Sequence, residues 1–434
     1  METQRKTLGQ LFVPICFETL FYMLAGMIDT LMLSSVSDQA VGAVGTANTY
    51  ISMFIIMFSI ISSGMIAVMT QNIGAGKPGV AYQAKQIGTL FNAVLGILLG
   101  LFFLVFSGTI LEIVGIAEAL KEPAMIYLRI VGGSCLLNAL IPVFAGYLRS
   151  FGFVKHSLYA TIIANILNFA LNALFLFGFH MGVMGVAIAT VISKVVNLLI
   201  VVVESKLLVH AKKDPVRQPN KVVLKEIIRI GLPSAMETAL YNIAMAFVIR
   251  FLNQMDADGL NVTARSYSSQ ITNFSFTIGA ALAQANAIMT GWRVGAKEYE
   301  ECDKATKRAA VIGVVVTVVV ASAIALFGSS IVGLLSDDPI IINLVGKLLV
   351  IDIVLEVGRV TNLVFGQALK TSGDAVFPVI IAAVFMYLCA VGGTYVFGIC
   401  LNLQVVGAFI GLAMDECIRA VFMFGRWQTG KWRN

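Results

Sequence analysis

Charged residues are scarce in this sequence. Of its 434 residues, 12% are Asp, Glu, Lys or Arg, about half the fraction that soluble domains carry. Hydrophobic residues make up 58%. This balance argues against a soluble globular protein and indicates a protein that lies mostly within a membrane.

Motifs of catalytic and metal-binding sites are also lacking. The chain has 3 histidines and no HExxH, no nucleotide-binding GxxxxGK[ST] and no GxSxG inside an apolar segment. Its 6 cysteines are scattered without CxxC spacing, which predicts buried packing residues. We therefore expect no enzyme, no cofactor and no nucleotide hydrolysis by this chain.

Long apolar runs are what the sequence does have. A segment such as "VIGVVVTVVVASAIALFGSSIVGLL" (311–335) exceeds the roughly 20 apolar residues that cross a bilayer as a helix. The hydrophobicity is continuous and does not alternate, so helices are favoured over barrel strands. We predict an all-α polytopic membrane protein with about twelve transmembrane helices. The expected spans are 8–34, 42–70, 84–113, 122–148, 156–179, 182–209, 224–253, 262–291, 305–335, 339–369, 374–399 and 403–425.

The connectors between these spans alternate in charge. Basic residues follow the even spans and flank both termini: Arg5, Lys6, Lys77, Lys85, Arg149, Lys155, Lys206, Lys225, Arg293, Arg308, Lys370, Arg426, Lys431 and Arg433. Acids are frequent after the odd spans: Asp38, Glu118, Glu122, Asp256, Asp258, Asp337 and Asp338. The positive-inside rule then places both termini and the middle loop in the cytoplasm, with the chain in the cytoplasmic membrane. The net charge of +6 reflects this topology and predicts no nucleic-acid partner.

The two halves of the sequence resemble one another. "VPICFETLFYM" (13–23) aligns with "LPSAMETALYN" (232–242), pairing Pro14 with Pro233 and Glu18 with Glu237. An even number of spans separates the pairs, so the halves share one orientation: two six-helix lobes related by a parallel internal repeat. The predicted domains are an N-terminal lobe (1–209), a cytoplasmic linker (210–222) and a C-terminal lobe with a short tail (223–434).

Several motifs then carry a family resemblance. In order along the chain they are "DTLMLSSVSDQAVGAVG", "QNIGAGK", "NILNFALNALFLFG" and "GVMGVAIATVIS". With this order and the duplicated spans, the chain resembles the multidrug and toxic compound extrusion (MATE) family over essentially its whole length. The resemblance implies export of amphipathic, cationic drugs or metabolites by alternating access, as antiport against Na⁺ or H⁺. Its expected partners are small amphipathic molecules and membrane lipids, and we expect it to act as a monomer.

Two acids interrupt the first apolar span. Asp29 and Glu18 are eleven residues apart, which leaves them within roughly 20° on one helix face and about 16 Å apart along the axis. An acid inside a span usually faces the protein interior and marks a path for an ion or substrate. We predict Asp29 as a coupling residue and Glu18 on the substrate or proton path. The open alternatives are a snorkelling or packing role for Asp29 and a hydrogen bond between helices for Glu18.

The resemblance supplies partners for Asp29. It implies a cation or proton site that also includes Asn168 and Asn172 of "NILNFALN" and Thr190 of "AIATV". Oxygen donors suit a hard cation such as Na⁺, and a carboxylate among amides can also take a proton. Asn172 stands where several members of the family place a second aspartate, which weakens the case for Na⁺. The asparagines could instead simply join helices.

The second half has its own charges within spans. Glu237, Asp352 and Glu356 are predicted on the substrate or proton path. Arg359 is three residues after Glu356, so these two side chains can pair on one helix face. Arg359 and Arg250 are predicted in structural pairing roles.

Other functions stay open at this point. A flippase for a lipid-linked or polyisoprenoid-linked substrate is the alternative closest in shape, although the sequence lacks the extra spans or arginine-rich cavity expected of one. A channel would also need acids within the membrane, but two similar lobes fit alternating access better. The exported compound and the choice between Na⁺ and H⁺ are not decided by the sequence.

Overall fold

The structure is a computed structural model that describes residues 6–211, 214–255, 259–333, 336 and 338–433. The chain divides into two compact units, Met1–Leu232 and Pro233–Asn434. Some residues used in the charge analysis lie outside the described ones, namely Arg5, Asp256, Asp258, Asp337 and linker residues 212 and 213. The predicted linker and lobe boundaries stay a prediction.

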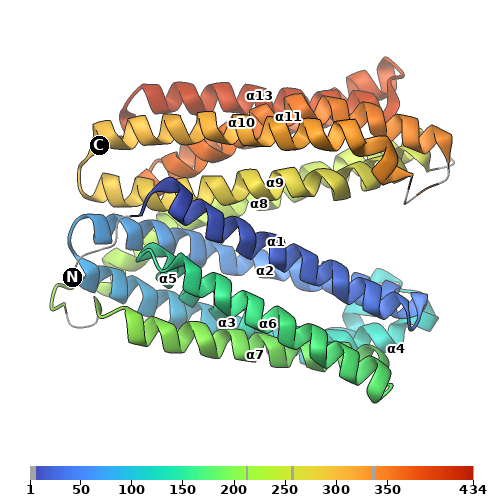
Figure 1. Ribbon diagram of the computed structural model, residues 1–434, viewed down its shortest axis with the longest axis horizontal. Helices are drawn as coiled ribbons and strands as arrows, with labels where there is room; N and C mark the ends of the chain where they lie inside the picture. Colours follow the sequence, from blue (N-terminus) through green and yellow to red (C-terminus); the bar gives the residue numbers. More distant parts are fainter. Residues whose placement is uncertain (1–5, 212–213, 256–258, 334–335, 337, 434) are drawn as a thin grey trace. The chain divides into compact units, whose positions relative to one another are not determined.

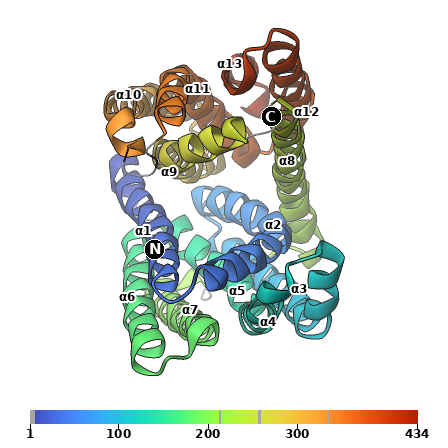
Figure 2. The ribbon, with the colours of Figure 1, turned by 90° about the vertical axis from the view of Figure 1, so that its right-hand side faces the viewer.

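The first unit is built from long helices (Figure 1). They are α1 (Leu8–Ser34), α2 (Asp38–Gly74), α3 (Pro78–Val114), α4 (Glu118–Tyr127), the π-helix η1 (Leu128–Gly132), α5 (Cys135–Ser150), α6 (Val154–Ala173), the π-helix η2 (Leu174–Gly178), α7 (Gly182–Leu208) and the start of α8 (Asn220–Met255). Within this unit α1 packs on α6, α6 packs on α7, and α5 packs on α7, as Figure 2 shows from the end of the helices.

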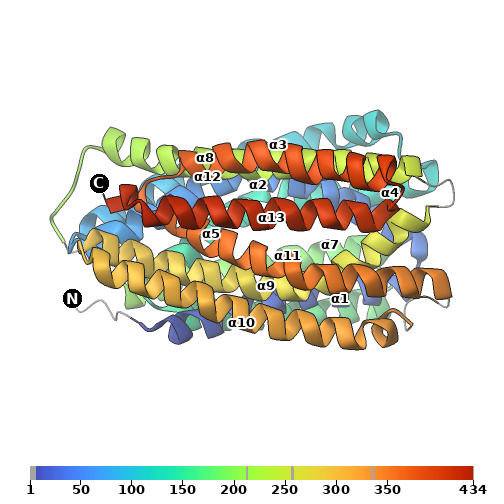
Figure 3. The same cartoon turned by 90° about the horizontal axis from the view of Figure 1, so that it is seen from above.

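The second unit continues from within α8. Its further elements are α9 (Leu260–Gly295), α10 (Tyr299–Val332), α11 (Pro339–Ser372), α12 (Val376–Phe385), η4 (Met386–Val391), η5 (Thr394–Cys400), α13 (Gln404–Gln428) and the short η6 (Lys431–Arg433). The helices α9, α10, α11 and α13 run lengthwise in Figure 3, and α11 packs on α9, α10 and α13.

The predicted fold class is confirmed. Among the described residues, eight helices are long and apolar enough to cross a membrane, and the pair Glu118–Gly132 and Cys135–Ser150, bent by 42°, forms a ninth candidate span. The other long helices, α9, α11 and α13, hold too many polar or charged residues to qualify by composition alone. Each of these elements coincides with one predicted span, so the protein is a helical, multi-pass membrane protein.

Local sequence explains where several helices begin and end. The Ser37 side chain accepts a hydrogen bond from the Ala40 backbone N–H at the start of α2, and Asp338 caps Ile340 at the start of α11. Pro78 and Pro339 occupy first-turn positions, where the missing N–H has no cost. Gly373 ends α11 with a φ of +105°, a conformation that glycine adopts without strain.

The crossing of α2 and α8 depends on two glycines. A Cβ added to Gly64 would lie 2.0 Å from the Ile227 carbonyl oxygen, and one added to Gly231 would lie 1.6 Å from that of Ile60. The two backbones therefore touch, as at helix contacts between small residues in membranes.

Candidate functional site

Asp29 is hydrogen-bonded to α6. Its carboxylate accepts a hydrogen bond of 2.7 Å from Asn172 Nδ2, and the same amide nitrogen donates to Asn168 Oδ1 at 3.2 Å. Asn168 and Asn172 are buried. The structure thus brings together three of the predicted coupling residues, with one helical turn of α6 facing the acid on α1.

A cavity of about 320 Å³ lies beside this contact. Asp29, Asn168 and Thr190 line it, while Asn172 bonds to Asp29 from outside the lining. The full lining is Tyr22, Ala25, Gly26, Asp29, Asn48, Tyr127, Asn138, Ile141, Pro142, Ala164, Asn165, Asn168, Thr190, Ser193, Lys194 and Asn197. Most of its polar groups are neutral amides and hydroxyls, so the cavity suits a polar or amphipathic guest.

Asp29 also borders a second, smaller cavity of about 140 Å³. The two cavities share Gly26, Asp29, Asn48 and Tyr127 as a common wall. Tyr127 itself interacts with the side chains of Asn48 and Thr190. The carboxylate therefore sits in a wall between two cavities, within reach of α1, α2, α4 and α7.

Sequence reasoning missed several residues of the larger cavity. Chief among them is Lys194 on α7, whose Nζ donates a hydrogen bond of 2.9 Å to Asn138 Oδ1 on α5. A lysine inside the apolar run "VISKVVNLLI" (191–200) is itself a signal of a functional site in a membrane. Tyr127 and Asn48 carried no such signal, because uncharged polar residues are common at helix contacts.

Glu18 does not join Asp29. It lines neither of the two cavities described above. Its Oε1 accepts a hydrogen bond of 2.6 Å from the Ser157 hydroxyl, and its Oε2 lies 3.5 Å from Arg149 Nη1. These contacts hold α1 to α5 and α6 in the N-terminal half of α1, whereas Asp29 lies in its C-terminal half.

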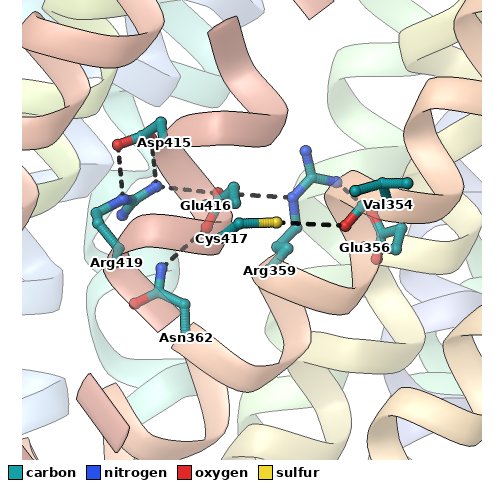
Figure 4. A network of polar contacts seen from close by, with 8 residues as sticks. All are labelled: Val354, Glu356, Arg359, Asn362, Asp415, Glu416, Cys417 and Arg419. Atoms are coloured by element: carbon teal, nitrogen blue, oxygen red, sulfur yellow. Dashed lines mark hydrogen bonds and ion pairs between the residues drawn. The ribbon is translucent and has the colours of Figure 1, made fainter. Parts of the chain in front are cut away.

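The charged residues of the second unit form a network between α11 and α13 (Figure 4). Glu356 pairs with Arg359, and Arg359 Nε also lies 3.7 Å from Glu416. Arg419 pairs with Asp415 at 2.7 Å and with Glu416 at 3.0 Å. Asn362 of α11 donates to Glu416 at 2.9 Å. Buried acids and arginines thus neutralise one another across the two helices.

The remaining predicted residues of this unit have different surroundings. Asp352 is buried near Arg359 but makes no hydrogen bond or ion pair with the described residues. Glu237 pairs with Lys370 of α11, a partner that local spacing could not reveal. Arg250, five residues before the end of α8, is exposed and has no ion-pair partner in the described part of the chain.

The Asp29 site is not a dense metal centre. In the part of the chain that the structure describes, no group of three or more His, Cys, Asp or Glu side chains is placed to hold a metal ion. A cation at Asp29 would be bound by one carboxylate and neutral oxygens. Among the described residues, the oxygen of the Asn172 amide is enclosed and has no hydrogen-bond partner. Because the amide nitrogen faces Asp29, the amide would have to turn over to offer this oxygen to a cation at Asp29.

Comparison with known proteins places the chain in context. The family model MatE matches residues 14–174 and 233–396, one match in each unit, beginning at the proline pair that heads the predicted repeat. The uncharacterized transporter YisQ of Bacillus subtilis is 32% identical over 96% of this chain and 93% of its own length. A probable multidrug resistance protein NorM of Thermotoga maritima is 24% identical over 99% of this chain and 93% of its own.

A solved structure shares the fold. It is an outward-facing multidrug resistance MATE family transporter of the MOP superfamily, with a TM-score of 0.90 at 22% identity, over 99% of this chain and 97% of that one. At this identity the match establishes the two-lobe fold.

Proposed function

The chain belongs to the MatE family of multidrug and toxic compound extrusion transporters, and on that basis we propose that it is a cation-coupled antiporter. It exports amphipathic, cationic drugs or metabolites in exchange for H⁺ or Na⁺. The observation that carries this proposal is the position of Asp29, a carboxylate on the first helix that forms part of the wall between two cavities.

The coupling step is a change of charge at Asp29. Ionised Asp29 accepts the hydrogen bond from Asn172, and a hydrogen bond to a charged group is worth about 1.5–3 kcal/mol. A proton or Na⁺ on the carboxylate weakens this contact between α1 and α6. It also removes the negative charge that would hold a cationic guest in the cavity, so ion and cargo compete for one group.

The residues around Asp29 would form the ion site. Na⁺ would use the Asp29 carboxylate, with the amide oxygens of Asn168 and Asn172 and the Thr190 hydroxyl as neutral ligands, since such oxygens suit hard cations. A proton needs only the carboxylate. A ligand shifts the transport cycle by binding one conformation more tightly than the other, and this site lies where α1, α6 and α7 meet.

The other acids belong to the proposal in a secondary role. Asp352 has no hydrogen-bond or ion-pair partner among the described residues, and Glu237 and Glu356 each pair with one cationic side chain. We assign these three acids, with Glu18, to the substrate or proton path. The protein would act as a monomer in the cytoplasmic membrane, with both termini in the cytoplasm and the two lobes rocking between outward-open and inward-open states.

Vesicle efflux tests this proposal. Purified full-length protein is reconstituted in liposomes loaded with a fluorescent amphipathic cation, and an inward Na⁺ gradient and an inward H⁺ gradient are imposed in turn. We expect one of the gradients to accelerate efflux at least severalfold over protein-free liposomes. Efflux that responds to neither gradient would contradict cation-coupled antiport.

A further inference from the structure

The larger cavity of the first unit contains a basic residue that the proposed mechanism does not use. Lys194 follows Thr190 by one helical turn of α7 and precedes Asn197 by another, so all three face the same cavity. A lysine in the middle of a membrane helix is costly, and such residues usually serve an ion or substrate path.

Lys194 is too deep in its helix to reach water by extending along it. It lies about 18 Å from the start of α7 at Gly182 and about 21 Å from the end at Leu208. Snorkelling applies to lysines near helix ends. The ammonium group must therefore be satisfied within the cavity.

Among the described residues, no carboxylate forms an ion pair with this ammonium. Its contact with the described residues is the hydrogen bond to Asn138 Oδ1, and no ion pair joins it to Asp29. Lysine has donors alone, so the atom of Asn138 that faces it must be the oxygen. The amide nitrogen of Asn138 then points elsewhere, and it is enclosed without a hydrogen-bond partner. The ammonium therefore keeps spare N–H groups, and the Asn138 amide beside it keeps a donor that none of the described residues uses.

The acid and the base of this cavity lie at different depths. The end of α1 and the start of α7 lie at the same end of the first unit (Figure 1). Asp29 is about 8 Å from the end of α1 and Lys194 about 18 Å from the start of α7, and the two side chains interact electrostatically without forming an ion pair. The cavity therefore has a negative region around Asp29 and a positive region around Lys194 and Asn138.

We propose that Lys194 and Asn138 bind a carboxylate of the cargo, while its cationic group competes with the coupling ion at Asp29. This inference rests on the proposed function and narrows its substrate class from amphipathic cations to zwitterionic amphiphiles. The ammonium and the amide N–H donate to the two carboxylate oxygens, and the charge-assisted bond supplies most of the discrimination. A purely cationic guest would leave both donors unmatched, which costs affinity.

A matched pair of dyes tests the proposal. A rhodamine with a free carboxylate is a zwitterion, and its methyl ester is a cation of nearly the same shape. Binding of each dye to purified full-length protein is measured by fluorescence polarisation for the wild type, Lys194→Gln, Lys194→Arg and Asn138→Leu. Lys121→Gln, on α4 and outside the cavity lining, is the matched control.

The expected result is a loss confined to the acid dye. Wild-type protein should prefer the acid over the ester, and Lys194→Gln should weaken acid binding about tenfold or more while changing ester binding less than about twofold. Lys194→Arg should retain part of the preference, Asn138→Leu should lose part of it, and Lys121→Gln should keep all of it. Thermal unfolding of each variant shows whether it is folded.

Several outcomes would overturn the proposal. The first is that wild-type protein binds the ester at least as tightly as the acid. The second is that Lys194→Gln weakens binding of both dyes equally. The third is that wild-type protein binds no member of a graded series of carboxylate amphiphiles. Because this binding is measured at equilibrium without a gradient, it is independent of the vesicle test. A protein that prefers the acid but shows no gradient-driven efflux would contradict the antiport and leave the Lys194 site standing.

Discussion

Asn172 fixes the hydrogen-bonding state of Asp29. Both hydrogens of its amide are used, one on Asp29 and one on Asn168, and its oxygen has no partner. Because Asn172 is a neutral amide, Asp29 is the single negative charge of this contact. In the proposed mechanism, a proton or a weakly held Na⁺ neutralises this single charge.

Asn172→Asp should make the site more responsive to Na⁺. The variant would place a carboxylate oxygen where the Asn172 amide nitrogen now lies 2.7 Å from Asp29, and two carboxylates this close cannot both stay ionised without a cation between them. We expect the Na⁺ concentration for half-maximal transport to fall severalfold, measured as dye efflux over a Na⁺ series at constant pH. The control is Asn165→Asp, two turns earlier on the same helix. An equal response in both variants would show that added charge alone, and not the contact with Asp29, is responsible.

Some residues of this candidate site could be predicted from the sequence and others could not. Asp29 could be found because a charge in an apolar span is conspicuous, and Asn168 with Asn172 because a family motif marks them four residues apart. Lys194 was equally conspicuous inside the predicted span 182–209, but the search for charges within spans did not include it. The pairing of Glu237 with Lys370 could not be predicted, since it depends on how α8 and α11 pack.

At the scale of the helices, the close approach of α2 and α8 is the tightest constraint on the first unit. The backbone at Gly64 lies against the carbonyl of Ile227, with no room for a side chain. Apolar periodicity predicts that each of these segments is a helix but does not say which helices touch. The π-helical segments η1 and η2 were likewise beyond prediction, because they arise where packing interrupts an otherwise regular helix.

Gly64→Ala should therefore destabilise the protein. The added methyl group would meet backbone, which cannot rotate away, and overpacking of this kind costs about 1–3 kcal/mol. Thermal unfolding of purified protein in detergent is the measurement, and a lowered Tm is expected. Gly45→Ala on the same helix is the control, because a Cβ there meets nothing within 4 Å. Equal Tm values for the two variants would show that α2 and α8 do not cross so closely.

At the scale of the whole molecule, the segment between the two repeats is anchored to the first unit. Asp214 accepts hydrogen bonds from the backbone N–H of Val216 at 3.0 Å and of Gly79, at the start of α3, at 2.7 Å. These two bonds, that of Val216 first, lower the pKa of the Asp214 carboxyl below its ordinary value. The connection that composition marked as a polar linker is thus tied to a helix N-terminus, which the charge pattern did not predict.

Asp214→Ala should release this anchor. Because the folded pKa is lowered, the contact contributes fully above the ordinary aspartate pKa and is lost as pH falls through the lowered value. Near neutral pH we expect the amides of Gly79 and Val216 to exchange hydrogen severalfold faster in the variant than in the wild type, while Glu118→Ala leaves them unchanged. Unaltered exchange in Asp214→Ala would contradict the anchoring contact.

The proposed transport mechanism depends on the charge of one side chain on α1, that of Asp29. Gradient-driven dye efflux from liposomes with Asp29→Asn is the most direct measurement of this. Glu112→Gln is the matched control, an identical acid-to-amide change at an exposed residue that pairs with Lys121 at 3.3 Å. We predict that Asp29→Asn lowers the gradient-driven rate at least about tenfold and that Glu112→Gln stays within about twofold of the wild type. Full gradient-driven efflux by folded Asp29→Asn protein would contradict the assignment of Asp29 as the coupling residue.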